Sequence, residues 1–364
     1  MEFGYSEEQK MLDESIRRFV NSEIPLDRIR ELVLEGTGYD ETIWKGLAEL
    51  GVLGVLIPEE FGGAGMGFLD ATIIQESLGF VCAPAPFLGT SIMAPTAILA
   101  AGSDDQKNKW LPEIAAGNLK VGLGLTEVTG VREKAGVTFN SGKASGKAMF
   151  VIDGECADGY ILAAGKETLI WVAAGAAGLT KTKLNTVDNT RGVVELVLDG
   201  VEAELIGTQN GEAAAVQKVV DAGRTALAAD LLGTSQRMLD RAVEYAMERK
   251  QFNRVIASFQ GLKHTCANMA ADLEPCRSMV WYAAHCQQEI PSEATLLACQ
   301  VKSHLSEVST PIANDTTLVH GGMGFTDLMG LHFWFKRIGL SRQLLGSPEA
   351  TREEAAVLQG WIAA

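Results

Sequence analysis

The fold prediction starts from residues 221–252, DAGRTALAADLLGTSQRMLDRAVEYAMERKQF. Leu227, Leu231, Met238 and Leu239 recur at the spacing of one face of a helix. The spacing predicts one long helix that ends near the phrase ERKQF.

Further long helices are predicted towards the C-terminus. A second helix is expected over residues 259–288, and Pro291 suits the first turn of a third. Apolar positions of the third helix are Val301, Leu305, Val308 and Ile312. This helix runs into the glycine turn HGGMGF at 320–325, and a last helix is expected from about Gly346. Long helices with short connections predict a helical bundle.

The first hundred or so residues also predict helices. Ser6 and Gln9 have the spacing of a capping box, ahead of apolar residues at helical spacing. Other helices are expected from about Asp40, over 71–80 and over 104–114. The glycines of PEEFGGAGMG, residues 58–67, predict tight turns instead of a helix.

The residue pattern changes from helical spacing to short apolar runs between about residues 119 and 219. Short runs rich in Val, Ile and Leu alternate there with Gly, Asp and Asn: KAMFVIDG, GYILAAG, TLIWVAAG and GVVELVLDG. These runs predict strands of a compact β domain. The glycine-rich segment SGKASGKAMF, residues 141–150, lacks the spacing of a phosphate loop and is predicted to be a hairpin.

Composition excludes several classes of protein. The formal net charge of −15 gives no electrostatic basis for binding nucleic acid. No apolar run is long enough for a membrane helix, and the N-terminus is not that of a secretion signal. Six cysteines without a C-x-x-C pair favour a reducing cytoplasmic compartment, and the five histidines show no spacing typical of a metal site.

Several phrases stand in an order that resembles the acyl-CoA dehydrogenase family along nearly the whole chain. They are LAELGVLGVLIPEEFGGAGMG (47–67), LT (125–126), SGKAMFVIDGECADGYILAA (145–164), DAGRTALAADLLG (221–233), ERKQFNRVIASFQGLKH (248–264) and VHGGMGF (319–325). The resemblance implies an α+β fold with an N-terminal α-helical domain over 1–118, a middle β-barrel-like domain over 119–219 and a C-terminal four-helix bundle over 220–364.

The resemblance also implies an activity. Members of the family remove two hydrogens from the α and β carbons of an acyl-CoA thioester: a carboxylate takes the α proton and FAD accepts the β hydride. FAD, an acyl-CoA substrate and an electron-transfer flavoprotein or similar acceptor are therefore expected.

The residues that bind the nucleotide end of FAD are retained. In the family, Arg, Phe and Gln of the ERK-x-F…Q stretch reach across a dimer interface to a neighbour's FAD, and here they match Arg249, Phe252 and Gln260. Gly321, Gly322 and Gly324 match the glycine turn that closes on the same tail. Arginine suits phosphate because its planar fork donates two parallel hydrogen bonds. A family glutamine is replaced by Leu318.

The catalytic base is missing. The family's usual glutamate position, counted from Arg337, falls on Gly346. A minority of members carry the base immediately before the arginine that matches Arg224, and that position is Gly223. Neither residue has a carboxylate.

The flavin-ring pocket also departs from the family. Its Trp-Ile-Thr phrase aligns with Phe150, Val151 and Ile152, so the hydroxyl near the flavin is absent. In TEVTGVREKAG, residues 126–136, Thr126 and Glu127 match the family's flavin loop, but the Gly-Ser-Asp end does not.

Three explanations compete. Glu349 or Glu353 acts as a displaced base, or the chain binds flavin and runs chemistry that needs no base. In the third, the chain is the smaller subunit of a heteromer, similar to the α2β2 complexes of steroid, cycloalkane and dicarboxylate catabolism. The third is preferred because the retained residues act on a neighbour's FAD. A non-catalytic scaffold is the rival class.

Asp221 and Arg224 match the family's Asp-x-x-Arg near the acyl entrance. They are candidates for substrate binding, although an acidic residue early in a helix is also favourable for the helix dipole alone.

Overall fold

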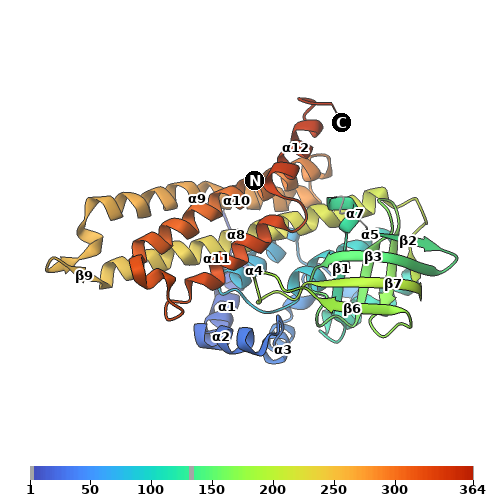
Figure 1. Cartoon of the computed structure of the whole chain (residues 1–364). Helices are drawn as coiled ribbons and strands as arrows, with labels where there is room; N and C mark the ends of the chain where they lie inside the picture. Colours follow the sequence, from blue (N-terminus) through green and yellow to red (C-terminus); the bar gives the residue numbers. More distant parts are fainter. Residues whose placement is uncertain (1–3, 131–134, 364) are drawn as a thin grey trace.

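The protein was analysed as a computed structural model that describes residues 4–130 and 135–363, without the side chains of Thr126 and Glu127. Three regions follow one another along the chain (Figure 1): helices, two small sheets, and a long helical bundle that narrows to one end. The predicted α+β fold class is confirmed.

The N-terminal region consists of helices. They are α1 (Glu7–Glu23), α2 (Leu26–Glu35), α3 (Glu41–Glu49), α4 (Phe68–Phe80), α5 (Ala94–Ala101) and α6 (Asp104–Ala115). The predicted capping box is present, since Ser6 Oγ accepts from the Gln9 amide and Gln9 Oε1 accepts from the Ser6 amide. Asp40 caps α3 by accepting from the Ile43 amide at 2.9 Å.

Helix α4 joins this region to the bundle. Almost every residue of α4 is buried, because the helix packs between α1 and the first bundle helix, α8 (Ala213–Glu248). Its backbone crosses α8 closely: a Cβ at Gly79 would lie 2.3 Å from Asp230 O, and a Cβ at Gly233 would lie 1.9 Å from Glu76 O. Only glycine allows this approach.

The middle region contains two four-stranded sheets, ordered β1-β4-β5-β8 and β2-β3-β7-β6. Their strands are β1 (Val121–Gly124), β2 (Gly136–Asn140), β3 (Lys143–Val151), β4 (Gly159–Ala163), β5 (Leu169–Ala173), β6 (Leu179–Lys183), β7 (Val194–Glu202) and β8 (Glu204–Ile206). The segment predicted as a hairpin, 141–150, holds only the turn at Ser141 and Gly142 and most of β3, which pairs antiparallel with the preceding strand β2.

The bundle is formed by α8, α9 (Gln260–Gln288), α10 (Pro291–His320), α11 (Leu331–Gln343) and α12 (Pro348–Leu358). Helix α10 packs against α8, α9, α11 and α12. Helix α8 begins at Ala213, ahead of the domain boundary that the sequence placed at 220. Helix α11 was not predicted, because Gly330 and Gly339 and its mixed composition obscure the helical period.

A buried charge cluster, Asp153, Arg191, Asp230 and Arg337, ties the bundle to the middle region. Asp230 is fully buried and accepts hydrogen bonds from Arg337 at 2.9 and 3.1 Å and from Arg191 at 3.3 Å. Burial alone would raise the pKa of Asp230, but the guanidinium groups of Arg337 and Arg191 outweigh burial and hold this pKa below its usual value.

Candidate functional site

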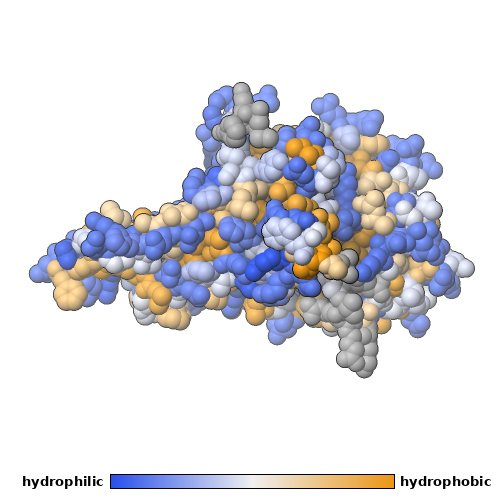
Figure 2. Space-filling model, turned by 90° about the horizontal axis from the view of Figure 1, so that it is seen from above, coloured by the Kyte–Doolittle hydropathy of each residue, from blue (hydrophilic) through white to orange (hydrophobic). Residues whose placement is uncertain are grey.

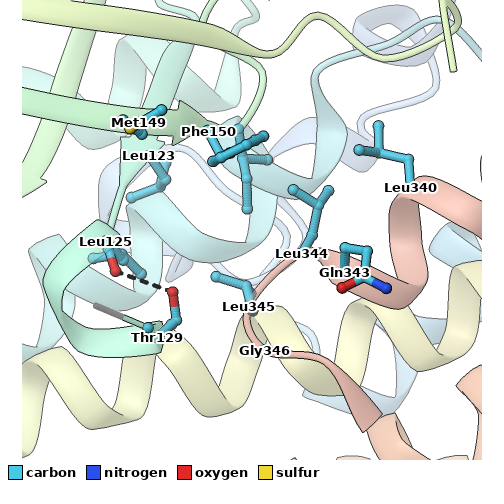
Figure 3. Close-up of a pocket in the computed structure, with 12 residues that line it drawn as sticks. Leu123, Leu125, Thr129, Met149, Phe150, Leu340, Gln343, Leu344, Leu345 and Gly346 are labelled. Atoms are coloured by element: carbon cyan, nitrogen blue, oxygen red, sulfur yellow. Dashed lines mark hydrogen bonds between the residues drawn. The ribbon is translucent and has the colours of Figure 1, made fainter. Parts of the chain in front are cut away.

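A cavity lies where the middle region meets the bundle (Figure 3). Its lining residues are Leu123, Leu125, Thr129, Gly130, Met149, Phe150, Ile152, Leu340, Gln343, Leu344, Leu345 and Gly346. Its volume is about 80 Å³, below the roughly 300–1,000 Å³ usual for small-molecule pockets. Among the described residues that line it, none carries a carboxylate.

The strands supply one wall of the cavity. Leu123 and Ile152 exchange backbone hydrogen bonds of 2.9 Å across an isolated bridge, which holds β1 beside the end of β3. Phe150 has a φ of +53°, a conformation that is strained for an aromatic residue. Phe150 and Ile152, which the sequence analysis aligned with the flavin-ring phrase of the family, line this cavity with apolar side chains, and the expected absence of a hydroxyl follows from Ile152 itself.

The opposite wall is the turn between α11 and α12, Leu344 to Gly346. Gly346 has a φ of +110°, and a Cβ built on it would lie 3.0 Å from Thr351 Cγ2 and 3.5 Å from Arg224 Nη2. Gly223 faces the same turn, since its Cβ would lie 2.4 Å from Leu345 Cδ1. Both positions at which the sequence analysis expected the family's base therefore border this turn, and other side chains lie close to them.

Arg224 lies behind this turn and is 3 % exposed. Its Nε donates to Leu345 O at 2.9 Å, and its Nη2 forms an ion pair with Glu354 Oε2 at 2.7 Å. Glu354 is the carboxylate that the sequence analysis missed. Its place one turn from the buried Thr351 and beside the buried Ala355 was the available signal.

The two carboxylates considered as displaced bases lie elsewhere. Glu349 is largely exposed and pairs with Arg342 at 3.1 Å, and Glu353 is also exposed. Neither lines the cavity. A proton acceptor must reach the reacting carbon within hydrogen-bond distance, so this arrangement gives no support to either residue as a base.

The candidate tail-binding residues gather at the narrow end of the bundle (Figure 1). A two-residue hairpin joins β9 (Lys250–Gln251) to β10 (Arg254–Val255), with Phe252 at φ +52° and Asn253 at φ +59°. Phe252 is 87 % exposed and makes an edge contact with Phe259, which Arg254 also covers. Arg249 precedes the hairpin, and Gln260 begins α9 beyond it; both are exposed.

The glycine turn lies beside the C-terminal end of α8. His320 ends α10 and stacks on Tyr245 of α8 with ring centroids 4.4 Å apart, and the Arg249 amide donates to Tyr245 O. Gly321, with φ +58°, and Gly322 have open space around them, whereas Gly324 packs against Thr317. Seen from above, this end is mostly hydrophilic, with hydrophobic spots at its tip (Figure 2).

The comparisons with known proteins agree with this arrangement. The sequence matches the models of the acyl-CoA dehydrogenase N-terminal domain over residues 6–118 and of the acyl-CoA dehydrogenase C-terminal domain over 211–357. The chain belongs to the acyl-CoA dehydrogenase family. The expected family is thereby confirmed.

Several acyl-CoA dehydrogenase relatives cover nearly the full chain. The acyl-CoA dehydrogenase IpdE2 of Mycolicibacterium smegmatis is 31% identical over 355 residues, which cover 97% of this chain and 99% of the relative. The ChsE4-ChsE5 complex from Mycobacterium tuberculosis contains a chain with 25% identity and a TM-score of 0.90, with full coverage of both chains. A variant of the steroid ACAD Tcur3481-Tcur3483 is 28% identical, with a TM-score of 0.88 and 98% coverage of each chain.

FAD is the cofactor of acyl-CoA dehydrogenases, and the two ends of the candidate site differ in how well they suit it. At the narrow end, exposed Arg249, Gln260 and open glycine backbone offer donors to a pyrophosphate. At the other end, the cavity of about 80 Å³ is too small for a three-ring flavin. Among the described residues, those at the narrow end therefore suit the nucleotide end of FAD better than those at the cavity suit its rings.

Of the remaining site residues that the sequence indicated, Asp221 does not line this cavity. Asp221 is buried, accepts from Thr295 at 2.6 Å and Gln217 at 2.8 Å, and borders an open groove of about 660 Å³. Burial raises its pKa against the effect of these hydrogen bonds. Thr126 begins α7 (Thr126–Thr129); its side chain, and residues 131–134 of the same loop, lie outside the described residues.

Gly346→Glu is expected to give no acyl-CoA dehydrogenase activity to the isolated chain. The positive φ is strained for any residue with a Cβ, so the free energy of unfolding should fall by about 1–3 kcal/mol. The new carboxylate would also lie next to Arg224. Urea unfolding and a dye-reduction assay measure the two effects. The control is Gly175→Glu, because Gly175 has open space around it and no positive φ. Activity of Gly346→Glu comparable to that of a base-bearing homologue would contradict the expectation.

Phe252→Asn is expected to separate backbone strain from ring contacts. Asparagine tolerates the left-handed conformation, so the free energy of unfolding should stay the same or rise by up to about 1 kcal/mol. A complex that depends on the Phe252 ring should nevertheless retain less FAD after gel filtration. The control is Leu34→Gln, which replaces an exposed apolar residue far along the chain, on α2, and should alter neither the unfolding free energy nor FAD retention. Unchanged FAD retention in Phe252→Asn would argue against a role for the ring.

Proposed function

We propose that this chain is the smaller, base-lacking subunit of a heteromeric FAD-dependent acyl-CoA dehydrogenase. A larger homologous subunit would supply the catalytic glutamate and the flavin-ring pocket, and this chain would complete the FAD site of that partner. The complex would have α2β2 composition and would pass electrons to an electron-transfer flavoprotein or a similar acceptor.

One observation carries the proposal: Gly346 and Gly223, the two expected base positions, both border the turn 344–346, and neither has a carboxylate. Glu354, which lies close to this turn through Arg224, is ion-paired with Arg224 at 2.7 Å. A group that must abstract a proton needs to be free and close to the carbon. This chain offers no such group at its own cavity within the part that the structure describes.

The narrow end of the bundle gives independent support. Arg249, Phe252 and Gln260 face solvent together, and a pure scaffold has no need for such a set. Exposed apolar residues occupy the same end: Met247, Leu318, Phe325 and Leu328 are each at least 60% exposed. Apolar surface of this kind is typical of a protein interface, which is the expected location of a site shared between subunits.

The comparisons favour a heteromer over a homotetramer with a displaced base. One similar structure is a complex of two different chains, ChsE4 and ChsE5, and another is described as a steroid ACAD of two named components. An acyl-CoA with a steroid-derived or alicyclic acyl group is therefore the proposed substrate class. The cytoplasm is the proposed compartment, and no described helix has the length and apolar character to cross a membrane.

The flavin-to-chain ratio of the native complex tests the proposal. Expressed alone, the chain is expected to be insoluble, or soluble without flavin and without activity. Co-expression with the partner should give a yellow complex with half as many FAD molecules as chains. A soluble homotetramer with one FAD per chain that oxidises acyl-CoA would refute the proposal. A complex whose flavin content does not change when Arg249 is replaced would favour a non-catalytic scaffold.

A further inference from the structure

Lys302 is a fully buried lysine directly behind the cavity. It lies on α10, has no exposed surface, and its Nζ is 3.0 Å from Arg342 O, 3.2 Å from Gly346 O and 3.3 Å from Ser306 Oγ. Three acceptors match the three N–H groups of an ammonium ion. Two of them are backbone carbonyls that flank the turn between α11 and α12.

This lysine is costly for the fold. Among the described carboxylates, none lies within ion-pair distance of Lys302. Burial, followed by the charges of Arg224 on α8 and Arg342 on α11, lowers the pKa of Lys302 to about 7. Glu349 on α12 acts in the opposite direction. The other titratable groups that act on Arg224 are Glu354 on α12, Cys299 on α10 and Asp221 on α8. An apolar residue of similar shape would avoid the desolvation.

The turn that Lys302 contacts forms one wall of the cavity. Arg224 holds Leu345 O at 2.9 Å, while Lys302 holds the carbonyl groups of Arg342 and Gly346. Arg342 in turn donates to Ser306 O at 3.1 Å. The side chains of Leu344 and Leu345 point from this turn into the cavity (Figure 3). Their position therefore depends on donors that lie behind the turn.

We propose that Lys302 is the positioning residue of this wall: its ammonium ion holds the turn 344–346 against the bundle and keeps the cavity closed, and its neutral amine releases the turn. The inference does not depend on the proposed function, because the wall has the same construction whether or not a ligand enters.

The loss of charge explains the release. A neutral amine has two N–H groups for three acceptors, and it can keep both carbonyl bonds by giving up Ser306 Oγ, the most distant acceptor at 3.3 Å. The bonds to Arg342 O and Gly346 O then lack the positive charge that strengthened them. The difference between a charged and a neutral donor is worth about tenfold in a local opening equilibrium.

The local and global effects of pH have opposite signs. The pKa of Lys302 is lower in the folded chain than in the unfolded chain, so between about pH 7 and the unfolded value the unfolded state binds more protons. Through this group the stability of the whole chain therefore rises as pH increases above 7, while the hydrogen bonds that hold the turn become weaker. If Lys302 had a purely structural role, its replacement would lower the stability of the turn and that of the whole chain together.

Hydrogen exchange of the full chain, with its partner subunit where one is needed for solubility, tests the inference. The peptide covering 341–350 should exchange about tenfold faster at pH 8 than at pH 6 after correction for intrinsic rates. Lys302→Met should show the faster exchange at both pH values, with unchanged or increased resistance to urea. Lys336→Met, an exposed lysine on α11, should behave like the unchanged chain.

Equal protection of 341–350 in Lys302→Met and the unchanged chain at pH 6 would overturn the inference. A loss of urea resistance in proportion to the loss of protection would also overturn it, because it would indicate a general structural role. If Lys302→Met does not fold, the pH series of the unchanged chain against Lys336→Met still decides. No change in protection between pH 6 and 8 would then count against the inference.

Discussion

Asp230→Ala is expected to lower the free energy of unfolding by about 3–5 kcal/mol, a large part of the stability of a typical domain. The carboxylate is the shared acceptor of Arg337, Arg191, Gln75 at 2.9 Å and Ser341 at 3.2 Å. Its removal takes the closest anion from two buried guanidinium groups and leaves, among the described carboxylates, only Asp153, 3.8 Å from Arg191, and Asp188, 3.9 Å from Arg337. Soluble yield and the midpoint of urea unfolding measure the effect.

Two further variants make the Asp230 result interpretable. Asp272→Ala removes an exposed carboxylate on α9 and should change the unfolding free energy by less than about 0.5 kcal/mol. Asp230→Asn keeps the shape but not the charge and should fall between the two. If Asp230→Ala unfolds at the same urea concentration as Asp272→Ala, the cluster does not hold the bundle to the middle region.

Arg249→Ala is expected to weaken FAD retention by about 10–100-fold in the complex with the partner subunit, which corresponds to the loss of charge-assisted bonds to phosphate of about 1.5–3 kcal/mol. The activity of the complex should fall in proportion to its flavin content, and added FAD should restore part of it. Equilibrium dialysis and flavin absorbance measure these quantities. The chain itself should keep its stability, since Arg249 is exposed at the end of α8.

The matched control is Lys45→Ala. Lys45 lies on α3 and its side chain is 68% exposed, so this variant also removes one positive charge, but away from the narrow end of the bundle. Full flavin occupancy and an unchanged rate of acyl-CoA oxidation in Arg249→Ala would show that Arg249 is not needed to bind FAD. That result would favour a non-catalytic scaffold. A loss of flavin in both variants would point to general electrostatics instead of a specific contact.

Local sequence patterns predicted many of the secondary-structure elements. Ser6 with Gln9, and Asp40 ahead of its helix, gave helix starts at the observed residues, because caps depend on neighbours a few positions away. A hairpin was predicted over 141–150, where the structure has its turn and second strand, while the first strand lies ahead of that segment. Helix α11 was missed, since Gly330 and Gly339 interrupt its pattern and its stability comes from packing on α8 and α10.

The candidate site was predicted in part. The sequence by itself determined that positions 346 and 223 carry no base and that Arg249, Phe252 and Gln260 are present, because the identity of a residue at a motif position needs no coordinates. The tertiary structure alone decided that both glycines meet at one turn, that Glu354 is paired with Arg224, and that Lys302 lies behind the wall. Lys302 occupies a core position between Ala298 and Leu305 on α10, but which oxygens surround a buried charge depends on chains that are distant in sequence. Only folding brings those acceptors together, and their positions set the charge and shape of the cavity.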